Sequence, residues 1–324
     1  ADISQPRIGI ISNPKARRNR SQLPEVGRIV ANHPAIHHFV PSRQGETITA
    51  LQQFATAGVN VLAINGGDGT VARVLTELVN RQPFSQMPSI VLLPGGTTNM
   101  NAADIGMRGR LKKNIRLLVD WAKNGQVQVQ RIVRPVLRIR HEPDAPPRCG
   151  MFFGAGSIIR GMEYCQNHVH AAGLTDELGP AVTSIRAIWG MLRKDPTFTA
   201  PQPMRIELNS ANDISIRDVN LVLASSLERL FLGFHPYWGN ENAPLHCTWI
   251  QQPARRMMRV LPCILRGRRC KHLTPDNGYY SVNAGQIRLW MDANFAIDGE
   301  IYPASSEHPI IVDNGGAFDF LRIG

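Results

Sequence analysis

A glycine-rich motif, Gly66-Gly67-Asp68-Gly69-Thr70, stands between a short apolar run and an amphipathic pattern. Glycines let backbone N–H groups approach phosphate oxygens without a Cβ in the way, and the start of a helix adds partial positive charge. The motif therefore predicts a phosphate-binding loop at the carboxyl edge of a parallel sheet. Since a bare anion beside phosphate is unfavourable, we expect Asp68 to cap a helix or to reach a Mg²⁺ ion that neutralises both groups.

Two more polar turns follow apolar runs. The run 89–94 leads into a second glycine- and hydroxyl-rich loop, Gly95-Gly96-Thr97-Thr98-Asn99. The run 7–12 leads into Asn13 and Pro14 and then into a basic stretch over residues 15–20. Ligands bind outside the carboxyl ends of parallel strands, so two such loops on neighbouring strands can hold a nucleotide between them. Each loop alone is a weak signal, but their order and spacing together predict a nucleotide site.

Strand and helix patterns alternate along the first part of the chain, and these elements would position the loops. Short apolar, β-branched runs alternate with helical patterns, which favours right-handed βαβ units around a mainly parallel sheet. From about residue 126 the pattern changes to short runs of alternating polarity, which is typical of antiparallel strands. We therefore predict an α/β N-terminal domain over residues 1–130 and a C-terminal, largely antiparallel β-sandwich domain over residues 131–324. A helix inside the second domain would offer an apolar face formed by Ile185, Ile188, Trp189 and Leu192.

The composition limits the partners. The 324 residues carry a formal net charge of +11, which favours nucleic acid, nucleotide phosphates or an anionic membrane surface. Five cysteines without CxxC spacing indicate reduced, cytosolic thiols and no zinc knuckle. No run of about 18 apolar residues occurs, so we expect any contact with a membrane to be peripheral.

The motifs together resemble the diacylglycerol kinase catalytic-domain family, whose pattern is NPxSG, then GGDGT, then P-x-G-T-x-N. The matching stretches are "SNPK", "GGDGT" and "PGGTTNMNAADIG", and "FAIDGEIYP" is similar to the family's DGE segment. The family includes sphingosine kinases, ceramide kinases and bacterial lipid kinases. The resemblance covers most of the chain and implies an NAD-kinase-like fold for the α/β domain.

The resemblance also implies site residues. ATP would contact a set of loop residues: Asn13, Ser42, Gly66, Gly67, Asp68, Gly69, Thr70, Gly96, Thr97 and Asn99. Asp298 would be the general base, Glu300 would help to position Mg²⁺, and Asp68 would serve both in catalysis and as a metal ligand. Phosphoryl transfer needs such a carboxylate to orient an alcohol, and a metal between acidic side chains and phosphates.

Two features depart from the family pattern, and one matching segment has an alternative interpretation. Arginines follow "NPK" where the family has Ser-Gly, and a phosphate could be held there by guanidinium groups, although a solvated basic turn fits equally well. The acidic loop that binds a structural metal in bacterial members has no full equivalent, so we predict no structural metal. The tetrapeptide "IDGE" taken alone would also fit an ordinary β-turn.

The segment 255–272, "RRMMRVLPCILRGRRCKH", interleaves apolar residues with seven arginines and lysines. That composition suits an anionic membrane surface. A helix that packs on the core with a basic solvated end is the alternative. Because no aromatic residues accompany the arginines, we do not expect nucleic acid as the partner.

These observations predict an ATP- and Mg²⁺-dependent lipid kinase that is cytoplasmic and peripherally associated with the membrane. It would transfer the γ-phosphate to the primary hydroxyl of a two-chain membrane lipid, diacylglycerol or ceramide. A soluble kinase similar to NAD kinase is one alternative, although "PGGTTNMN" and the late "DGE" fit it poorly. A catalytically inactive lipid- or nucleotide-binding regulator is the other.

Overall fold

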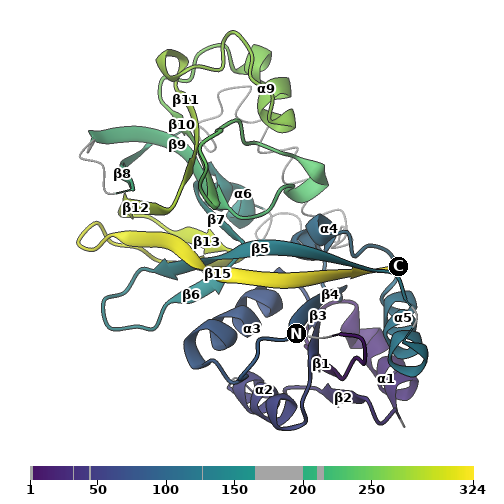
Figure 1. Cartoon of the computed structure of the whole chain (residues 1–324). Coiled ribbons are helices and arrows are strands. Elements are labelled where there is room, and N and C mark those ends of the chain that lie inside the picture. The colour runs from purple at the N-terminus through teal and green to yellow at the C-terminus, as the bar shows by residue number, and fades with distance from the viewer. Residues whose placement is uncertain (1–2, 32, 44, 126, 165–199, 210–214) are drawn as a thin grey trace. The chain divides into compact units, whose positions relative to one another are not determined.

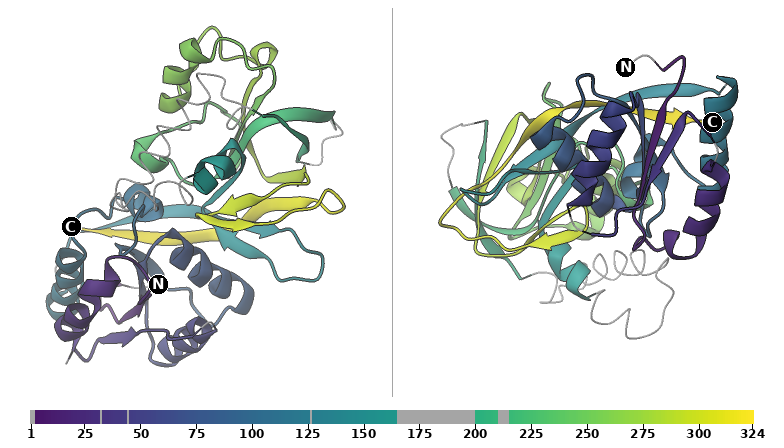
Figure 2. Two further views of the ribbon diagram at one scale, coloured as in Figure 1. Left: turned by 180° about the vertical axis from the view of Figure 1, so that it is seen from behind. Right: turned by 90° about the horizontal axis from the view of Figure 1, so that it is seen from below.

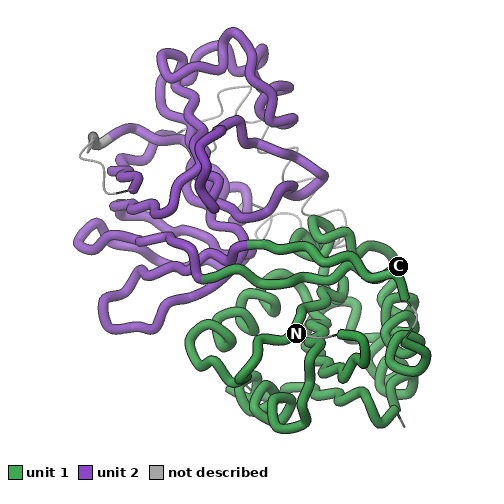
Figure 3. The backbone as a smooth tube through the Cα atoms, in the orientation of Figure 1, with its two compact units in different colours: residues 1–134, 316–324 green, residues 135–315 purple. Residues whose placement is uncertain are grey.

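The computed structural model describes residues 3–31, 33–43, 45–125, 127–164, 200–209 and 215–324 (Figure 1). The chain divides into two compact units, coloured separately in Figure 3. Unit 1 comprises Ala1–Arg134 and Gly316–Gly324, and unit 2 comprises Pro135–Gly315. The predicted helix with Ile185 and Trp189 lies outside the described residues.

Unit 1 contains a parallel sheet, as the alternating pattern predicted. Its strands lie in the order β2 (Ile36–Phe39), β1 (Ile8–Ser12), β3 (Val61–Gly66), β4 (Ser89–Pro94) and the end of β15 (Ile310–Ile323), and each neighbouring pair is parallel. The strands β1, β3 and β4 are buried at every position. Parallel strands covered on both faces read as continuous apolar runs, and the sequences of these strands do so.

Helices cover this sheet in two groups. In the first, α1 (Asn19–Val30) packs against α5 (Leu111–Asn124), and in the second, α2 (Glu46–Thr56) packs against α3 (Asp68–Arg81). The short helix α4 (Met100–Ile105) follows β4 and packs on it. Helix α3 buries Val71, Val74, Leu75 and Leu78, which recur at helical spacing on one face. This packing fixes the point where α3 begins, and the GGDGT motif lies at that point.

Unit 2 is largely antiparallel, as predicted. Its main path runs β14-β13-β7-β9-β8-β12-β15, β9 also pairs with β10, and β10 pairs with β11. The elements are β6 (Arg148–Gly150), β7 (Phe152–Gly156), α6 (Ser157–Tyr164), β8 (Gln202–Leu208), β9 (Ser215–Ser225), η2 (Phe231–Gly233), β10 (Leu245–Gln251), α9 (Met257–Arg266), η3 (Pro275–Asn277), β11 (Tyr279–Ala284), β12 (Gln286–Trp290), β13 (Phe295–Ile297) and β14 (Glu300–Tyr302). Side chains from these strands form one apolar core that includes Phe153, Phe295 and Leu289.

Two long strands belong partly to each unit, and they change the expected domain boundaries. Strand β5 (Val129–Arg140) leaves unit 1 after Arg134, close to the expected boundary at residue 130. Strand β15 pairs with β5, as Figures 1 and 2 show, and its last residues return to unit 1. There Phe320 is fully buried and pairs with Ile90 of β4. Residues 316–324 are therefore part of unit 1, and not of a second domain that extends to residue 324.

We did not predict β15, although its sequence alternates in polarity. Ile310 and Val312 are buried before Gly315-Gly316, and Phe318 and Phe320 are buried after this pair. A Gly-Gly pair between two such runs is a typical turn signal. Here Gly316 has a φ of +113° inside one continuous strand. The glycines therefore permit a local irregularity of the strand without ending it.

Candidate active site

The two glycine-rich loops of unit 1 touch each other through their backbones. They follow β3 and β4, which are neighbours in the sheet. A Cβ placed on Gly96 would lie 2.4 Å from the Cα of Gly67, and a Cβ on Gly95 would lie 2.5 Å from Oδ1 of Asn65. Contacts this short are impossible for a real Cβ, so any larger residue at either position would force the loops apart. The loops over residues 66–70 and 95–99 therefore form one continuous surface.

Asp68 connects the first loop to the helix after the second. Its Oδ2 accepts a hydrogen bond of 3.0 Å from the backbone N–H of Met100, and its Oδ1 accepts one of 2.9 Å from Asn101. These N–H groups open α4, so Asp68 caps a helix, although the helix is not its own. Burial raises the pKa of the Asp68 carboxyl, while the N–H groups of Asn101 and Met100 act in the opposite direction.

This arrangement leaves one helix N-terminus for an anion. The first N–H groups of a helix have no partner one turn earlier, and the helix dipole favours negative charge there. Asp68 occupies these groups at α4. At α3 the N-cap residue is Gly67, which has no side chain. No N-cap side chain therefore bonds to the first N–H groups of α3. The start of α3 is therefore where this site can bind phosphate.

Side chains at both ends of the loops hold their shape. Asn99 has a left-handed backbone with a φ of 49°, and its side chain accepts from Gly96 N–H at 2.8 Å and donates to Gly96 O at 2.7 Å. The Nδ2 of Asn13 donates to Oγ1 of Thr70 at 2.8 Å. Four of the predicted nucleotide contacts thus form two hydrogen-bonded pairs, Asn13 with Thr70 and Gly96 with Asn99. Thr97 lies half-buried in the same loop.

A buried polar network that we did not predict supports these loops. Asn19 donates to the carbonyl oxygens of Asn13 and Asn65, at 2.8 and 3.1 Å. The side chain of Asn65 donates to Oγ of Ser12 at 2.9 Å, and Nε2 of His38 lies 2.9 Å from the same oxygen. The only sequence signal is a polar residue at the end of an otherwise apolar strand, as in "NVLAIN" and "IGIIS".

The basic turn after β1 also has a defined contact. Arg18 donates its backbone N–H to Gly95 O at 3.0 Å. Its guanidinium donates to Pro94 O at 3.2 Å and to Gly109 O at 3.4 Å. Arg18 is therefore not part of a freely solvated turn, because it binds backbone carbonyls next to the second loop. A contact of this turn with phosphate stays a hypothesis. Lys15 and Arg20 are exposed.

Ser42, also expected at the nucleotide, lies at the start of α2. Its N–H donates to Glu46 Oε2 at 2.7 Å, and its hydroxyl donates to Glu46 Oε1 at 3.1 Å. Bonds of this kind from residues before a helix to an acid in its first turn stabilise the helix start. The backbone N–H groups of Ser42 and Arg43 lower the pKa of Glu46. In this conformation Ser42 fixes a helix end, and its contact with nucleotide stays a prediction.

The expected base, Asp298, lies in unit 2, in the two-residue turn between β13 and β14. Asp298 and Gly299 have φ values of 45° and 91°, which is the pattern of a type I′ hairpin turn, for which Asp-Gly is a preferred pair. The carboxylate is buried and accepts from Met151 N–H at 2.9 Å and from Phe152 N–H at 3.0 Å. The IDGE segment thus forms the β-turn that the sequence alone also allowed. Within this turn, the Asp298 carboxylate is directed into the fold.

The expected metal ligands have other partners in this structure. Glu300 is exposed and accepts a hydrogen bond of 2.8 Å from the Tyr302 hydroxyl, and both oxygens of Asp68 accept backbone N–H groups. Within the described residues, no three His, Cys, Asp or Glu side chains come together to hold a metal. These donors do not form a metal site by themselves. A shared Mg²⁺ at Asp68 and Glu300 stays a prediction.

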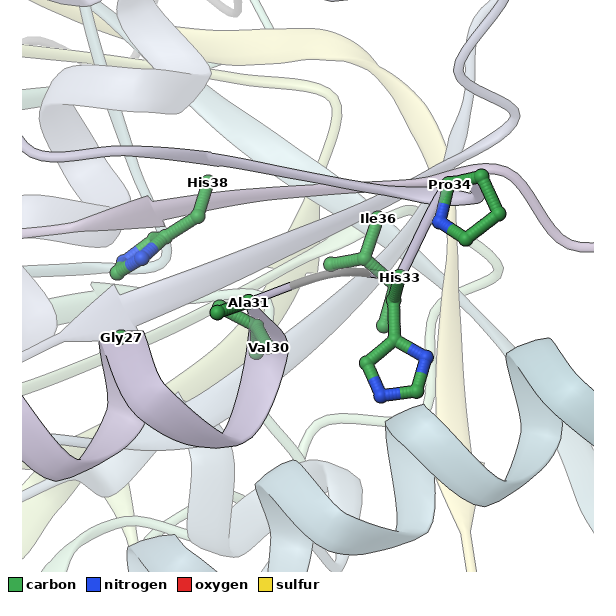
Figure 4. Close-up of a pocket in the computed structure, with 7 residues that line it drawn as sticks. All are labelled: Gly27, Val30, Ala31, His33, Pro34, Ile36 and His38. Carbon is green, nitrogen blue, oxygen red and sulfur yellow. The ribbon is translucent and has the colours of Figure 1, made fainter.

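A cavity of about 450 Å³ lies elsewhere in unit 1 (Figure 4). Its lining comes from the end of α1 and from β2, and includes Val30, His33, Ile36 and His38. Ile36 is the first residue of β2, so the cavity lies at the amino end of that strand, whereas the glycine loops follow the carboxyl ends of β3 and β4. No predicted site residue lines it.

Residues 7–130 match the family model described as the diacylglycerol kinase catalytic domain. This segment contains both glycine loops and Asn13. Over these residues the chain is similar to the diacylglycerol kinase catalytic domain, and the resemblance carried by the three motifs is confirmed. Asp298 and Glu300 lie outside the matched residues.

Curated relatives match over a shorter stretch. The chain is 27% identical over 114 residues to "Probable lipid kinase YegS-like" of Enterobacter sp. (strain 638), which covers 35% of this chain and 38% of that protein. It is 30% identical over 84 residues to "Probable lipid kinase YegS" of Escherichia coli O127:H6 (strain E2348/69 / EPEC), which covers 26% and 28% of the two chains. The aligned part thus spans well under half of each relative.

The fold agrees with a solved structure over almost the whole chain. A diacylglycerol kinase from Bacillus anthracis str. Sterne superposes with a TM-score of 0.59 and 18% identity, and covers 97% of this chain and 96% of that one. At this identity the likeness shows the fold alone. It confirms the predicted combination of an α/β N-terminal domain and a largely antiparallel C-terminal region.

Proposed function

We propose that the protein is an ATP-dependent lipid kinase that phosphorylates the primary hydroxyl of a two-chain lipid of the diacylglycerol or ceramide type. The observation that carries the proposal is the direct backbone contact between the two glycine loops at the start of α3. It lies within the segment that matches the family. The names of both curated relatives support a lipid as the acceptor.

The loops would bind the nucleotide phosphates. Backbone N–H groups at the start of α3 would donate to phosphate oxygens, and the absence of side chains on Gly67 and Gly96 lets the two loops approach each other there. Asn13 and Thr70 would keep the first loop in place through their mutual hydrogen bond. Phosphoryl transfer depends mainly on positioning and on charge neutralisation, and a rigid loop pair supplies the first of these.

Asp298 is the proposed base. In the reaction the lipid hydroxyl would lose its proton to this carboxylate as the oxygen attacks the γ-phosphorus and ADP leaves. Each carboxylate oxygen accepts one backbone N–H, from Met151 and from Phe152. The two N–H groups would hold the carboxylate in a fixed orientation. Mg²⁺, where required, would be bound chiefly by the phosphates of ATP.

The test is phosphate transfer from γ-labelled ATP in the presence of Mg²⁺. Purified full-length protein would be offered micellar diacylglycerol, ceramide, sphingosine and phosphatidylglycerol, and NAD in a separate reaction. We expect label in diacylglycerol or ceramide. Label in NAD alone would replace the proposal with a soluble small-molecule kinase, and transfer to none of the acceptors would favour the inactive, regulatory alternative.

A matched pair of variants separates the chemistry of Asp298 from its place in the turn. Asp298→Asn removes the base and tolerates the left-handed backbone, whereas Gly299→Ala strains the same turn and keeps the carboxylate. We expect transfer to be lost in Asp298→Asn and largely kept in Gly299→Ala, at temperatures where both are folded by circular dichroism. Transfer that survives in Asp298→Asn would show that another group accepts the proton.

A further inference from the structure

The segment of unit 2 that contains α9 is rich in exposed positive charges. We call these charges the cationic face, and its seven members are all exposed: Arg255, Arg256, Arg259, Arg266, Arg268, Arg269 and Lys271. Figure 1 shows α9 with the turns that flank it at the edge of unit 2. The charges come from the helix and from both of these turns. The positive charges are therefore not confined to one side of the helix.

Several apolar residues of the same segment are buried. Val260 and Ile264, one turn apart on α9, are buried in a small core with Ile250, Leu273 and Tyr279. Met257 and Cys263 pack against that core. The apolar side of α9 is thus covered by the rest of unit 2. This excludes, for the observed conformation, the insertion of Val260 and Ile264 into a lipid layer.

Most of the positive charges around α9 have no acidic partner among the described residues. Among the described residues, no member of the cationic face forms a salt bridge with a carboxylate. Arg256 lies 2.9 Å from Nδ1 of His272, and Arg269 donates to Trp238 O and to Asn240, both at 3.1 Å. Burial, followed by the charges of Arg256, Arg259 and Lys271, lowers the pKa of His272. Arg269 also interacts electrostatically with the carboxylate of Glu241, so its charge is partly balanced. Among the described residues, the other six members of the face keep their charges for a partner.

We propose that the cationic face binds the surface of an anionic phospholipid bilayer by electrostatic adsorption, without insertion of α9. The proposal deepens the proposed function and rests on it, because a kinase that acts on membrane lipids must reach them at an interface. Arginine and lysine side chains bind phosphate headgroups through charge-assisted hydrogen bonds. The attraction of such a face falls within a Debye length, so it holds the protein at the surface and not inside the layer.

A bilayer fits this face better than a nucleic acid does. Single-stranded nucleic acids bind to basic grooves with exposed aromatic side chains, and the segment 255–272 contains none. Its one strongly exposed large apolar side chain is Met258, at 67%. Met258 is a single side chain next to Arg259 in the chain, so the exposed residues of this segment are mainly charged.

Vesicle co-sedimentation of the full-length protein tests the proposal. The probes are vesicles of phosphatidylcholine alone and of phosphatidylcholine mixed with phosphatidylglycerol, at low and at high salt. We expect binding only to the mixed vesicles, and loss of binding at high salt. Each arginine near an anionic surface changes the binding constant roughly fivefold. The variant Arg255→Glu/Arg259→Glu/Arg266→Glu should therefore bind more than roughly 100-fold more weakly.

A charge-matched control uses exposed residues on three helices of unit 1. Arg28→Glu/Lys123→Glu/Arg81→Glu alters the net charge by the same amount at sites in α1, α5 and α3. We expect this control to keep most of its vesicle binding. Equal weakening in both triple variants would show that net charge alone drives adsorption, and tighter binding to duplex DNA than to the mixed vesicles would show a nucleic-acid surface. Either result overturns the proposal.

Phosphate transfer to a short-chain, monomeric diacylglycerol distinguishes this proposal from the proposed function. The cationic-face variant should transfer to the monomeric lipid at the wild-type rate, and should lose transfer to diacylglycerol presented in mixed vesicles. Equal loss with both substrates would overturn the proposal, because it would place the damage outside membrane docking. Vesicle binding by a wild type without transfer to any lipid would refute the kinase and leave the docking surface intact.

Discussion

Asp68 joins two loops through a single carboxylate, and this role explains its place beside a phosphate site better than a bare charge does. Replacement by Asn keeps the shape but leaves one acceptor where two backbone donors, Met100 and Asn101, need one each. We expect Asp68→Asn to lower the free energy of unfolding by about 1 to 3 kcal/mol, the cost of a buried donor without a partner. Urea unfolding would measure it. A change below about half a kcal/mol, typical of neutral surface sites, would contradict this role.

The same residue predicts a pH dependence. Burial raises the pKa of the Asp68 carboxyl above its ordinary value of 3.8. A carboxyl whose pKa rises on folding binds its proton more tightly in the folded state, so its stabilising contribution is complete below 3.8 and is lost as pH rises through the folded pKa. The stability of the wild type relative to Asp68→Asn should therefore fall as pH rises above 3.8. A relative stability that increases with pH would show instead that the pKa is lowered.

Residue types predicted part of this site. Gly96, Asn99 and Thr70 were expected in it because glycine, amide and hydroxyl residues after a strand suit phosphate. The partner of Asp68 was not predictable, since it is the backbone of residues that follow a different strand. The role of Ser42, by contrast, could have been predicted from the sequence. Its role at the start of α2 depends on Glu46, four residues later, which the pattern did contain.

At the scale of elements, Arg18 connects the turn after β1 to the loop after β4. Replacement by Ala would remove two bonds to carbonyl oxygens, those of Pro94 and Gly109. We expect Arg18→Ala to lower the free energy of unfolding by about 1 to 2 kcal/mol, and to raise the KM for ATP more than it lowers kcat. Arg20→Ala, at the exposed second residue of α1, is the control and should match the wild type. Equal effects of the two variants would mean that the turn acts only through its charge.

Strands were easiest to predict where burial is complete. The runs that became β1, β3 and β4 were recognised within one residue at each end, because both faces of each strand are covered and nearly every position is apolar. Strand β15 was not recognised, because Gly315-Gly316 resembles a turn and its two apolar runs looked like separate segments. The helical pattern of α9 did not show which side was covered. Its apolar and basic residues fit a membrane surface and a packed helix equally well.

At the scale of the whole molecule, the last strand completes the first unit. Phe320 is fully buried and pairs with Ile90, so its removal would leave a cavity in the sheet of unit 1. We expect Phe320→Ala to lower the free energy of unfolding by about 3 to 5 kcal/mol. Val133→Ala, where the side chain is 56% exposed, should cost about half a kcal/mol or less. Similar costs at both positions would show that residues 316–324 are not part of this core.

The central claim is that the paired glycine loops of unit 1 bind the phosphates of ATP, and calorimetric titration of the full-length protein with ATP tests it most directly. Gly96→Ala places a Cβ 2.4 Å from the Cα of Gly67, whereas Gly27→Ala in α1 meets no atom within 4 Å. We predict that the wild type and Gly27→Ala bind ATP alike, and that Gly96→Ala binds at least roughly tenfold more weakly, since a misplaced loop loses its phosphate contacts. Unchanged affinity in a folded Gly96→Ala would contradict the account.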